Sequence, residues 1–302
     1  MRAHALLRTL ALTALACAST GLVAPTLSAQ AKEEWRSWNQ PVKPFRVIDN
    51  VYYVGANEVT SYLITSPSGH VLLDGGFEET APQILRNIRA LGFRPRDVKV
   101  LLNSHAHFDH AAGLAMLRDS TGARLIANPR DAALLARGGM NDFGLGDTGP
   151  FPPVKPDSLL RDGQVIRVGT AAIQAHFTPG HTQGCTTYTA SAREGGRTYR
   201  LLFGCSYTTL DYRLVAPESY PGIAADFAGT FRTLRSLPCD VPLATHGSWF
   251  HLTEKIERMR TPGAPNPFID PAGCRAAITG AEEAFRAKVR EQTAARAAAP
   301  RG

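Results

Sequence analysis

The sequence predicts an α/β protein built from two similar halves. Between residues 45 and 74, short β-rich runs are separated by Asp-Asn and Pro-Ser-Gly turns, a pattern typical of antiparallel strands. Helix-like and strand-like segments then alternate, and the order of strands followed by helices recurs between residues 165 and 292. Because the same order of elements occurs twice, we expect two halves that face each other.

In the first half, we predict strands over residues 45–48, 51–54, 61–64 and 71–74. An amphipathic helix is predicted over residues 78–91, because Ile84, Ile88 and Leu91 recur near one face. The elements predicted after this helix are a strand over 98–102, a helix over 111–117, a strand over 125–127 and a helix over 130–136.

In the second half, we predict strands over residues 165–166, 172–177, 186–189 and 199–203, followed by helices over 224–237, 253–260 and 282–292. The chain after about residue 294 is rich in Ala, Arg and Pro, and we expect it to fray. Residues 138–156 are rich in Gly and Pro and are too many for a plain connection. They form either a mobile loop or a wall over a binding site.

The N-terminus has the pattern of a secretory signal peptide. Arg2 and Arg8 precede an apolar run, and small residues follow at Ala29 and Ala31. We therefore predict a signal peptide over residues 1–29, with cleavage after 31 as an alternative, and a single domain over residues 30–302. A lipid-anchored form attached through Cys17 remains open. The expected location is the periplasm or the exterior, and no segment is long and apolar enough to span a membrane.

Composition and charge narrow the class of protein. Hydrophobic residues make up 44% and charged residues 20% of the chain, which is typical of a globular protein. The net charge is +7, but the Lys and Arg residues are scattered, which favours solubility over nucleic-acid binding. We expect a small-molecule substrate and a monomer.

Four cysteines remain after signal removal, and an oxidising compartment favours disulfides between them. Cys185 and Cys205 flank two strand-like runs separated by Glu-Gly-Gly, so a hairpin would place them opposite each other. Cys239 and Cys274 would then pair. Four cysteines allow three connectivities, of which we prefer Cys185–Cys205 with Cys239–Cys274.

A cluster of metal-binding residue types follows the strand predicted over residues 98–102. His105, His107, Asp109 and His110 lie within six consecutive residues, and such groups repel one another unless a cation holds them. Imidazole and carboxylate together suit zinc. The cluster holds more ligands than one open catalytic site uses, so we expect two zinc ions.

Two later histidines extend this cluster. His181 lies in Thr-Pro-Gly-His-Thr-Gln-Gly and His246 in Thr-His-Gly. Each follows a predicted strand or turn beside glycine, where an imidazole can approach a metal without steric conflict. The remaining histidines carry no such context and are interpreted as ordinary surface or core residues: His4, His70, His176 and His251.

The motifs His-Ala-His-Phe-Asp-His, Thr-Pro-Gly-His-Thr-Gln-Gly and His-Gly resemble those of the metallo-β-lactamase superfamily, over about residues 36 to 260. The resemblance implies a four-layer αβ/βα sandwich, with two mixed β-sheets between helices and a dinuclear zinc site between the sheets. It also implies two ligand sets, namely His105, His107 and His181 for the first zinc, and Asp109, His110 and His246 for the second.

The segment Gly204-Cys205-Ser206 narrows the resemblance. Glyoxalase-II-like hydrolases, lactonases and the nuclease branches of the superfamily usually have there a Gly-Asp whose carboxylate bridges both metals. This chain lacks that carboxylate, as the true β-lactamases do. Cys205 cannot be a thiolate ligand if it is tied to Cys185. With Asp109, His110 and His246 on the second zinc, the third subclass of metallo-β-lactamases is the closest match.

The resemblance implies an exported zinc enzyme that hydrolyses the β-lactam amide bond with a zinc-bound hydroxide and confers antibiotic resistance. Asp109 would bind zinc and orient the hydroxide, and Ser206 would help to hold the substrate carboxylate. We also expect Asp74, which precedes Gly-Gly, to fix the ligand loop. The alternatives are an exported hydrolase of a lactone or thioester, and a secreted metal-binding protein without catalysis.

Overall fold

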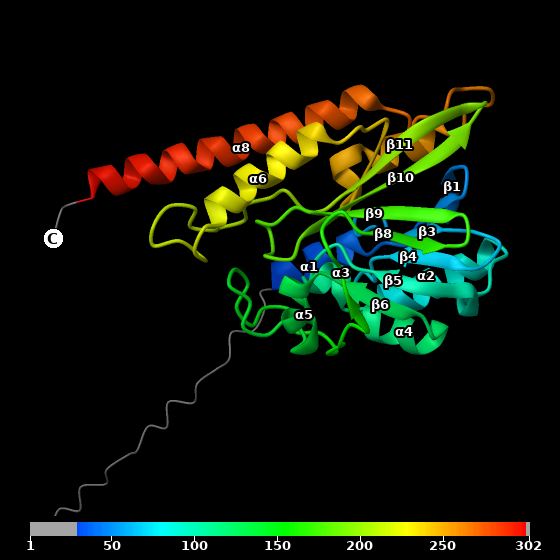
Figure 1. Ribbon diagram of the computed structural model, residues 1–302, viewed down its shortest axis with the longest axis horizontal. Helices are drawn as coiled ribbons and strands as arrows, with labels where there is room; N and C mark the ends of the chain where they lie inside the picture. The colour runs from blue at the N-terminus through cyan, green and yellow to red at the C-terminus, as the bar shows by residue number, and fades with distance from the viewer. Residues whose placement is uncertain (1–28, 300–302) are drawn as a thin grey trace, which may run out of the picture.

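Two β-sheets packed face to face form the centre of the protein, and helices cover both outer faces (Figure 1). The computed structural model describes residues 29–299. The first sheet contains, in spatial order, β1 (Phe45–Ile48), β2 (Val51–Tyr53), β3 (Tyr62–Ile64), β4 (His70–Leu73), β5 (Val98–Leu102), β6 (Arg124–Ala127) and β7 (Ser158–Leu159). The second contains β12 (Val241–Ala244), β11 (Arg197–Gly204), β10 (Thr186–Glu194), β9 (Ala171–Phe177) and β8 (Val165–Val168).

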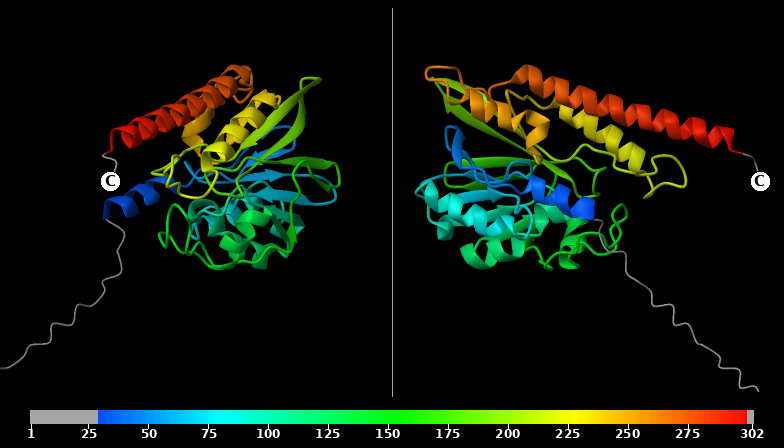
Figure 2. Two further views of the ribbon diagram at one scale, coloured as in Figure 1. Left: turned by 60° about the vertical axis from the view of Figure 1, so that its left-hand side comes forward. Right: turned by 180° about the vertical axis from the view of Figure 1, so that it is seen from behind.

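Most of the helices divide between the two outer faces, which confirms the predicted four-layer sandwich (Figure 2). The first half contributes α1 (Ala29–Trp38), α2 (Thr80–Ala90), α3 (Phe108–Ala111), α4 (Leu114–Thr121) and α5 (Pro129–Ala136). The second contributes α6 (Ile223–Ser236), α7 (Leu252–Arg258) and α8 (Pro271–Ala298). Two short 3₁₀ helices, η1 (Pro95–Asp97) and η2 (Gly247–Phe250), complete the described elements.

Apolar burial explains the layers. The inner faces of the two sheets meet in one core, in which the rings of Tyr62 and Phe203 lie 5.2 Å apart. Ile84 and Ile88 of α2 are fully buried against the outer face of the first sheet, as their helical spacing predicts. Phe227 and Phe231 of α6 pack with α8 over the second sheet.

The direction of the strands determines which loops lie together at one edge of the sandwich. The predicted antiparallel meander over β1 to β4 is confirmed, and β4, β5, β6 and β7 then run parallel. In the second sheet, β11 and β12 are parallel. Because the carboxyl ends of parallel strands meet at one edge of a sheet, the loops that follow β5 and β12 can approach each other between the sheets.

The preferred disulfide pairing is confirmed. Strands β10 and β11 form the predicted hairpin, and Cys185 is bonded to Cys205 at its open end. Cys239 is bonded to Cys274 and connects the segment before β12 to the first turn of α8.

The C-terminal helix is longer than predicted. It begins at Pro271, where proline suits the first helical position, and the Asp270 side chain caps it by accepting a hydrogen bond from Gly273 N at 2.9 Å. We predicted fraying after about Ala294, but α8 continues to Ala298. The rich content of alanine, the best helix former, favours this continuation.

The sequence also left several elements unpredicted, namely α1, α3, β7, β12 and the two 3₁₀ helices. Strand β12 has the sequence Val-Pro-Leu-Ala, and a proline argues against a central strand. It lies at the edge of its sheet, where proline is tolerated.

The predicted signal peptide lies almost entirely outside the described residues. Within residues 29–299, none of the helices combines the length and the apolar character that crossing a membrane requires.

Replacing Cys239 and Cys274 together by Ser tests the contribution of this cross-link, which spans a sequence separation of 35 residues. We expect the free energy of unfolding to fall by about 2–4 kcal/mol, because the unfolded chain gains freedom when the loop is opened. Urea unfolding of the oxidised protein and of the double variant measures the difference. A loss below about 1 kcal/mol would show that the packing of α8 alone holds this end of the sheet.

Candidate metal centre

The structure brings the predicted ligand residues together at one edge of the two sheets. His105 and His107 follow β5, and Asp109 and His110 lie in α3. His181 follows β9, and His246 follows β12. All six side chains are buried or nearly buried.

The first predicted set forms a compact group. The ring centroid of His181 lies 4.8 Å from that of His105 and 4.6 Å from that of His107. One nitrogen from each of the three rings lies within 4.8 Å of the others, which suits a shared metal ion. Gly180, with φ +142°, turns the chain in the left-handed region just before His181.

The second predicted set forms a triangle of ligand atoms. The Nε2 atoms of His110 and His246 lie 3.2 Å apart. Asp109 Oδ2 lies 3.2 Å from His110 Nε2 and 3.4 Å from His246 Nε2. Three donor atoms at these separations surround a position that one cation could fill.

Two histidines of the first set have one ring nitrogen free to bind a metal ion. Nδ1 of His105 lies 3.0 Å from Ser104 Oγ, and Nδ1 of His181 lies 2.9 Å from the Thr208 carbonyl oxygen. These contacts occupy one nitrogen of each ring, so Nε2 remains available to the cluster. Burial lowers the pKa of His105 and of His181 well below the usual value, and it lowers the pKa of His107 to about 4. Neutral imidazole, the form that binds metals, is therefore the stable form.

In the second set, the neighbouring carboxylates favour a positive charge, whereas burial favours neutral rings in the first set. Burial alone would raise the pKa of Asp109, but contacts with His110 and His246 hold it well below its usual range. Burial likewise opposes the charge of His246, yet hydrogen bonds to Asp109 and Glu58 raise its pKa to about 9. The carboxylates thus favour a positive charge here, and a divalent cation supplies more of it than a proton does.

Asp74 lies where the sequence predicts a residue that fixes the ligand loop. Its Oδ1 accepts hydrogen bonds from Ser104 N at 2.7 Å and from Asn103 Nδ2 at 3.1 Å. Its Oδ2 lies 3.9 Å from His110 Nδ1. Asp74 has φ +64°, a conformation unfavourable for most residues. The backbone is therefore strained at the point where this carboxylate faces the cluster.

A second carboxylate, Asp131 at the start of α5, was not singled out from the sequence. It is 3% exposed and accepts hydrogen bonds from Ala106 N at 2.9 Å, Thr182 Oγ1 at 2.8 Å and Gly184 N at 2.8 Å. It therefore ties the loop that carries His105 and His107 to the loop that carries His181. Burial raises its pKa to about 6.

A third carboxylate, Glu58, supports the other side of the cluster and was also missed. Its Oε1 lies 3.4 Å from His246 Nδ1, and it accepts hydrogen bonds from the hydroxyl and the backbone N–H of Ser248. Glu58 and Asp131 resemble ordinary turn and helix-start residues in the sequence. Only the folded chain shows what they contact.

The Cys185–Cys205 disulfide lies directly behind the cluster. Sγ of Cys205 is 3.7 Å from Nδ1 of His105. Because the two sulfurs are bonded to each other, neither is available as a thiolate ligand.

The remaining histidines of the described chain lie elsewhere. His176 contacts Thr189, and His70 packs on Phe93.

The cluster opens into a cavity of about 480 Å³. Trp38 and Trp249 line it, and Ser206 lies beside the cluster with its Oγ 3.2 Å from Thr208 Oγ1. Leu145 and Thr148 also line it, which favours a wall as the interpretation of residues 138–156. Phe143 and Phe151 of that segment pack into apolar cores instead.

The comparison with protein families identifies the class of protein. The family model described as "Metallo-beta-lactamase superfamily" matches residues 54–246, which is more than half of the chain. The protein therefore belongs to the metallo-beta-lactamase superfamily.

Solved structures of this superfamily resemble the chain over most of its length. A Cronobacter sakazakii metallo-beta-lactamase with a HARLDQ motif is 40% identical, with a TM-score of 0.83 over 86% of this chain and 99% of its own. FEZ-1 of Legionella gormanii is 36% identical, with a TM-score of 0.82 over 84% and 98%. BJP-1 of Bradyrhizobium japonicum, a subclass B3 enzyme, is 36% identical, with a TM-score of 0.79 over 85% and 97%.

Curated relatives are more varied and match over shorter stretches. A probable metallo-hydrolase of Burkholderia pseudomallei is 30% identical over 53% of this chain and 54% of its own length. A hydroxyacylglutathione hydrolase of Methylobacterium nodulans is 32% identical over 36% of this chain and 34% of its own. The chain thus spans about half, or less, of the length of these two relatives.

The Asp131→Ala variant tests the link between the two ligand loops. It leaves three buried donors without an acceptor, so we expect the metal-free protein to lose about 3 kcal/mol of stability or more. Zinc affinity should fall by about tenfold to a hundredfold, because the ligands lose their support. Urea unfolding and competition with a chelator measure the two effects. The matched control is Asp119→Ala, an exposed helical aspartate of the same half. Equal losses in both variants would contradict a linking role.

Proposed function

We propose that the protein is a zinc-dependent β-lactamase of the third subclass, exported to the periplasm or the exterior and able to confer β-lactam resistance. One observation carries the proposal. Two adjacent sets of three candidate ligand residues open into a single substrate-sized cavity, in a chain that is 36–40% identical to solved metallo-beta-lactamases over nearly their whole length. The subclass B3 description of BJP-1 supports the finer assignment.

The residues present fit two zinc ions. His105, His107 and His181 would hold the first, because their buried imidazoles are neutral. Asp109, His110 and His246 would hold the second, because their donor atoms face one another. Bound zinc supplies an activated water as nucleophile and polarises the carbonyl that is attacked.

The side chains around the cluster then orient the reaction. Asp109, which is ionised, accepts a hydrogen bond from the attacking water and aims it at the β-lactam carbonyl. Trp38 and Trp249 exclude bulk water and strengthen electrostatic contacts in the cavity. Glu58 and Asp74 keep the rings of His246 and His110 in place from behind.

Ser206 is the proposed contact for the substrate carboxylate. Its hydroxyl faces Thr208 at 3.2 Å and does not cap a backbone group among the described residues. It lies on the cavity wall beside His181 and can donate a hydrogen bond to an anion there. This contact would fix the β-lactam ring over the metal cluster.

Export is supported by the signal-like sequence of residues 1–29 and by the two disulfides. Disulfides persist in oxidising compartments such as the periplasm. They would therefore stabilise the enzyme where β-lactams reach their targets.

The alternative function is hydrolysis of a lactone or thioester. Relatives named hydroxyacylglutathione hydrolase, such as that of Methylobacterium nodulans, favour it. Against it, Gly204-Cys205-Ser206 offers no carboxylate to the metals, and Cys205 is bonded to Cys185. The observed cavity wall at this position presents a serine instead.

Turnover by the purified protein decides between these activities. The zinc-loaded enzyme is assayed on a penicillin, a carbapenem, a simple lactone and a hydroxyacyl thioester, with and without a chelator. We expect β-lactam turnover that the chelator abolishes and that added zinc restores. Turnover confined to the lactone or the thioester would replace the proposal with its alternative.

His181→Ala tests the ligand assignment through metal content. Removing one of three ligands should empty the first site, so the zinc content should fall from about two ions per chain to about one or fewer. The control is His176→Ala, which changes a histidine of the preceding strand that contacts Thr189. Elemental analysis after dialysis measures both variants. An unchanged zinc content in His181→Ala would refute the assignment.

Ser206→Ala tests substrate binding by its effect on kinetics. Loss of one hydrogen bond to a charged group should raise KM for penicillins by about tenfold. If the contact binds substrate and transition state equally, kcat should change by less than about twofold. Steady-state kinetics measure both values, with the exposed Ser120→Ala as control. An unchanged KM would exclude Ser206 from carboxylate binding.

A further inference from the structure

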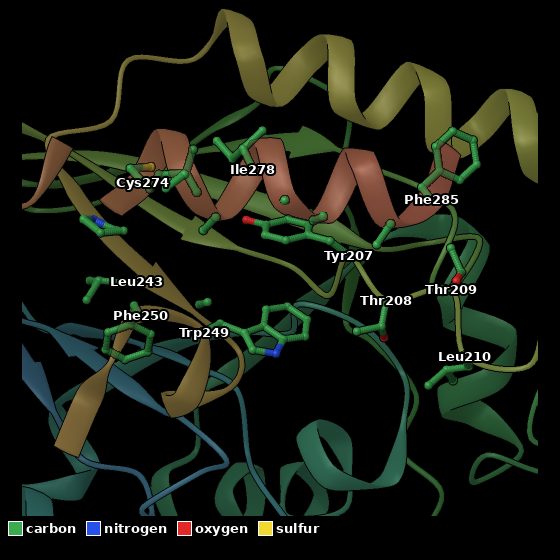
Figure 3. A pocket seen from close by; sticks show the side chains of 18 residues that line it. Tyr207, Thr208, Thr209, Leu210, Leu243, Trp249, Phe250, Cys274, Ile278 and Phe285 are labelled. Atoms are coloured by element: carbon green, nitrogen blue, oxygen red, sulfur yellow. The ribbon is translucent and has the colours of Figure 1, made fainter. Parts of the chain in front are cut away.

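A second cavity, of about 490 Å³, lies under α8 (Figure 3), and Trp249 lines both this cavity and the metal cavity. We propose that it binds an uncharged, mostly apolar molecule that carries one hydrogen-bond acceptor. The cavity lies between α8, the loop after β11, β12 and η2. It does not depend on the proposed function, because no metal ligand lines it.

The sequence of α8 keeps the cavity open. The helix contributes mainly small residues to the lining, including Ala277, Gly280, Ala281 and Ala284. These residues recur with helical spacing along one flank. A Cβ atom built on Gly280 meets no other atom within 4 Å. The large apolar residues Ile278 and Phe285 anchor the helix beside this flank, so the space is not closed by collapse of α8.

Tyr207 gives the cavity an uncharged hydrogen-bond donor, beside the hydroxyls of Thr208 and Thr209. The side chain is only 9% exposed, and Figure 3 shows its ring between α8 and Trp249. Among residues 29–299, its hydroxyl has no hydrogen-bond partner, and the residue lines the cavity. The hydroxyl lies so close to Gly204 that a Cβ there would be 1.7 Å away. Gly204 thus leaves room for the hydroxyl, which is free to donate a hydrogen bond to a ligand atom in the cavity.

The lining defines the chemistry of the ligand. No Lys, Arg, Asp, Glu or His residue contributes to it, so a charged ligand would lose its hydration without compensation. Apolar side chains such as Leu243 and Phe250 surround the space and favour an aromatic or aliphatic body. An acceptor such as a ketone or ester oxygen would pair with the hydroxyl of Tyr207.

The two cavities share a wall but have different chemistry. Trp249, Thr208 and Leu210 line both. The Trp249 ring lies 5.4 Å from that of Tyr207 and 5.3 Å from that of His246. The metal cavity contains carboxylates and imidazoles, whereas the second cavity contains none. Competition experiments can therefore assign a ligand to one or the other.

Binding is tested on the full mature chain with prodan, an uncharged naphthalene ketone whose emission shifts to shorter wavelength in an apolar environment. We expect saturable binding with a blue shift. Neither a chelator nor a β-lactam should displace the probe. Absence of a saturable shift would overturn the proposal. Displacement by the β-lactam would also overturn it, because the probe would then occupy the metal cavity.

Larger side chains placed in the cavity test whether the probe binds there. Ala277→Leu and Ala284→Leu place larger side chains on the lining flank of α8, and each should weaken prodan binding by about tenfold or more. The control is Ala287→Leu, which changes an exposed residue of the same helix that does not line the cavity. Circular dichroism and thermal melting show that each variant is folded. Equal affinity in all folded variants would contradict the location.

The role of the Tyr207 hydroxyl is tested with two ligands of similar shape. Acetylnaphthalene has a carbonyl acceptor, and ethylnaphthalene has none. Tyr207→Phe should weaken displacement of prodan by acetylnaphthalene by about threefold to tenfold, the value of one hydrogen bond, and leave ethylnaphthalene unchanged. If both ligands are equally affected, or neither is, the assigned acceptor contact is wrong.

Discussion

The repulsion and desolvation of buried ligand groups is the constraint on which the structure depends. His105, His107 and His181 are buried together as neutral rings. Asp109 beside them remains ionised. Such a group is unfavourable unless a cation compensates it. The surrounding fold is arranged to hold it, since carboxylates approach the ligand loops from three sides and a disulfide lies behind His105.

Each of the three supporting carboxylates holds a different segment of the cluster. Asp74 holds the start of the first ligand loop, and Asp131 ties that loop to the one that carries His181. Glu58 holds His246 from the other half of the sandwich. The two halves therefore meet through hydrogen bonds to ligand residues as well as through the apolar core. Metal binding and the docking of the halves should stabilise each other, because both need the same loop positions.

Local sequence patterns could predict the residues of the cluster but not most of their supports. The cluster residues lie in short motifs after strands, and hydrophobic periodicity predicts α2 and the antiparallel strands. Asp131 is separated from Thr182 by 51 residues, and Ser248 from Glu58 by 190. No periodic pattern records contacts of that separation. Likewise, the small residues of α8 reveal a cavity only once Tyr207 and Trp249 are placed opposite them.

A zinc titration of the metal-free protein tests the central claim most directly. Calorimetry counts the ions bound, and thermal melting of the same samples measures the stability gained. The account predicts that about two zinc ions bind per chain and that the melting temperature rises with each, because a cation relieves a buried and mutually repelling cluster. Binding of no zinc, or binding that leaves the melting temperature unchanged, would contradict it.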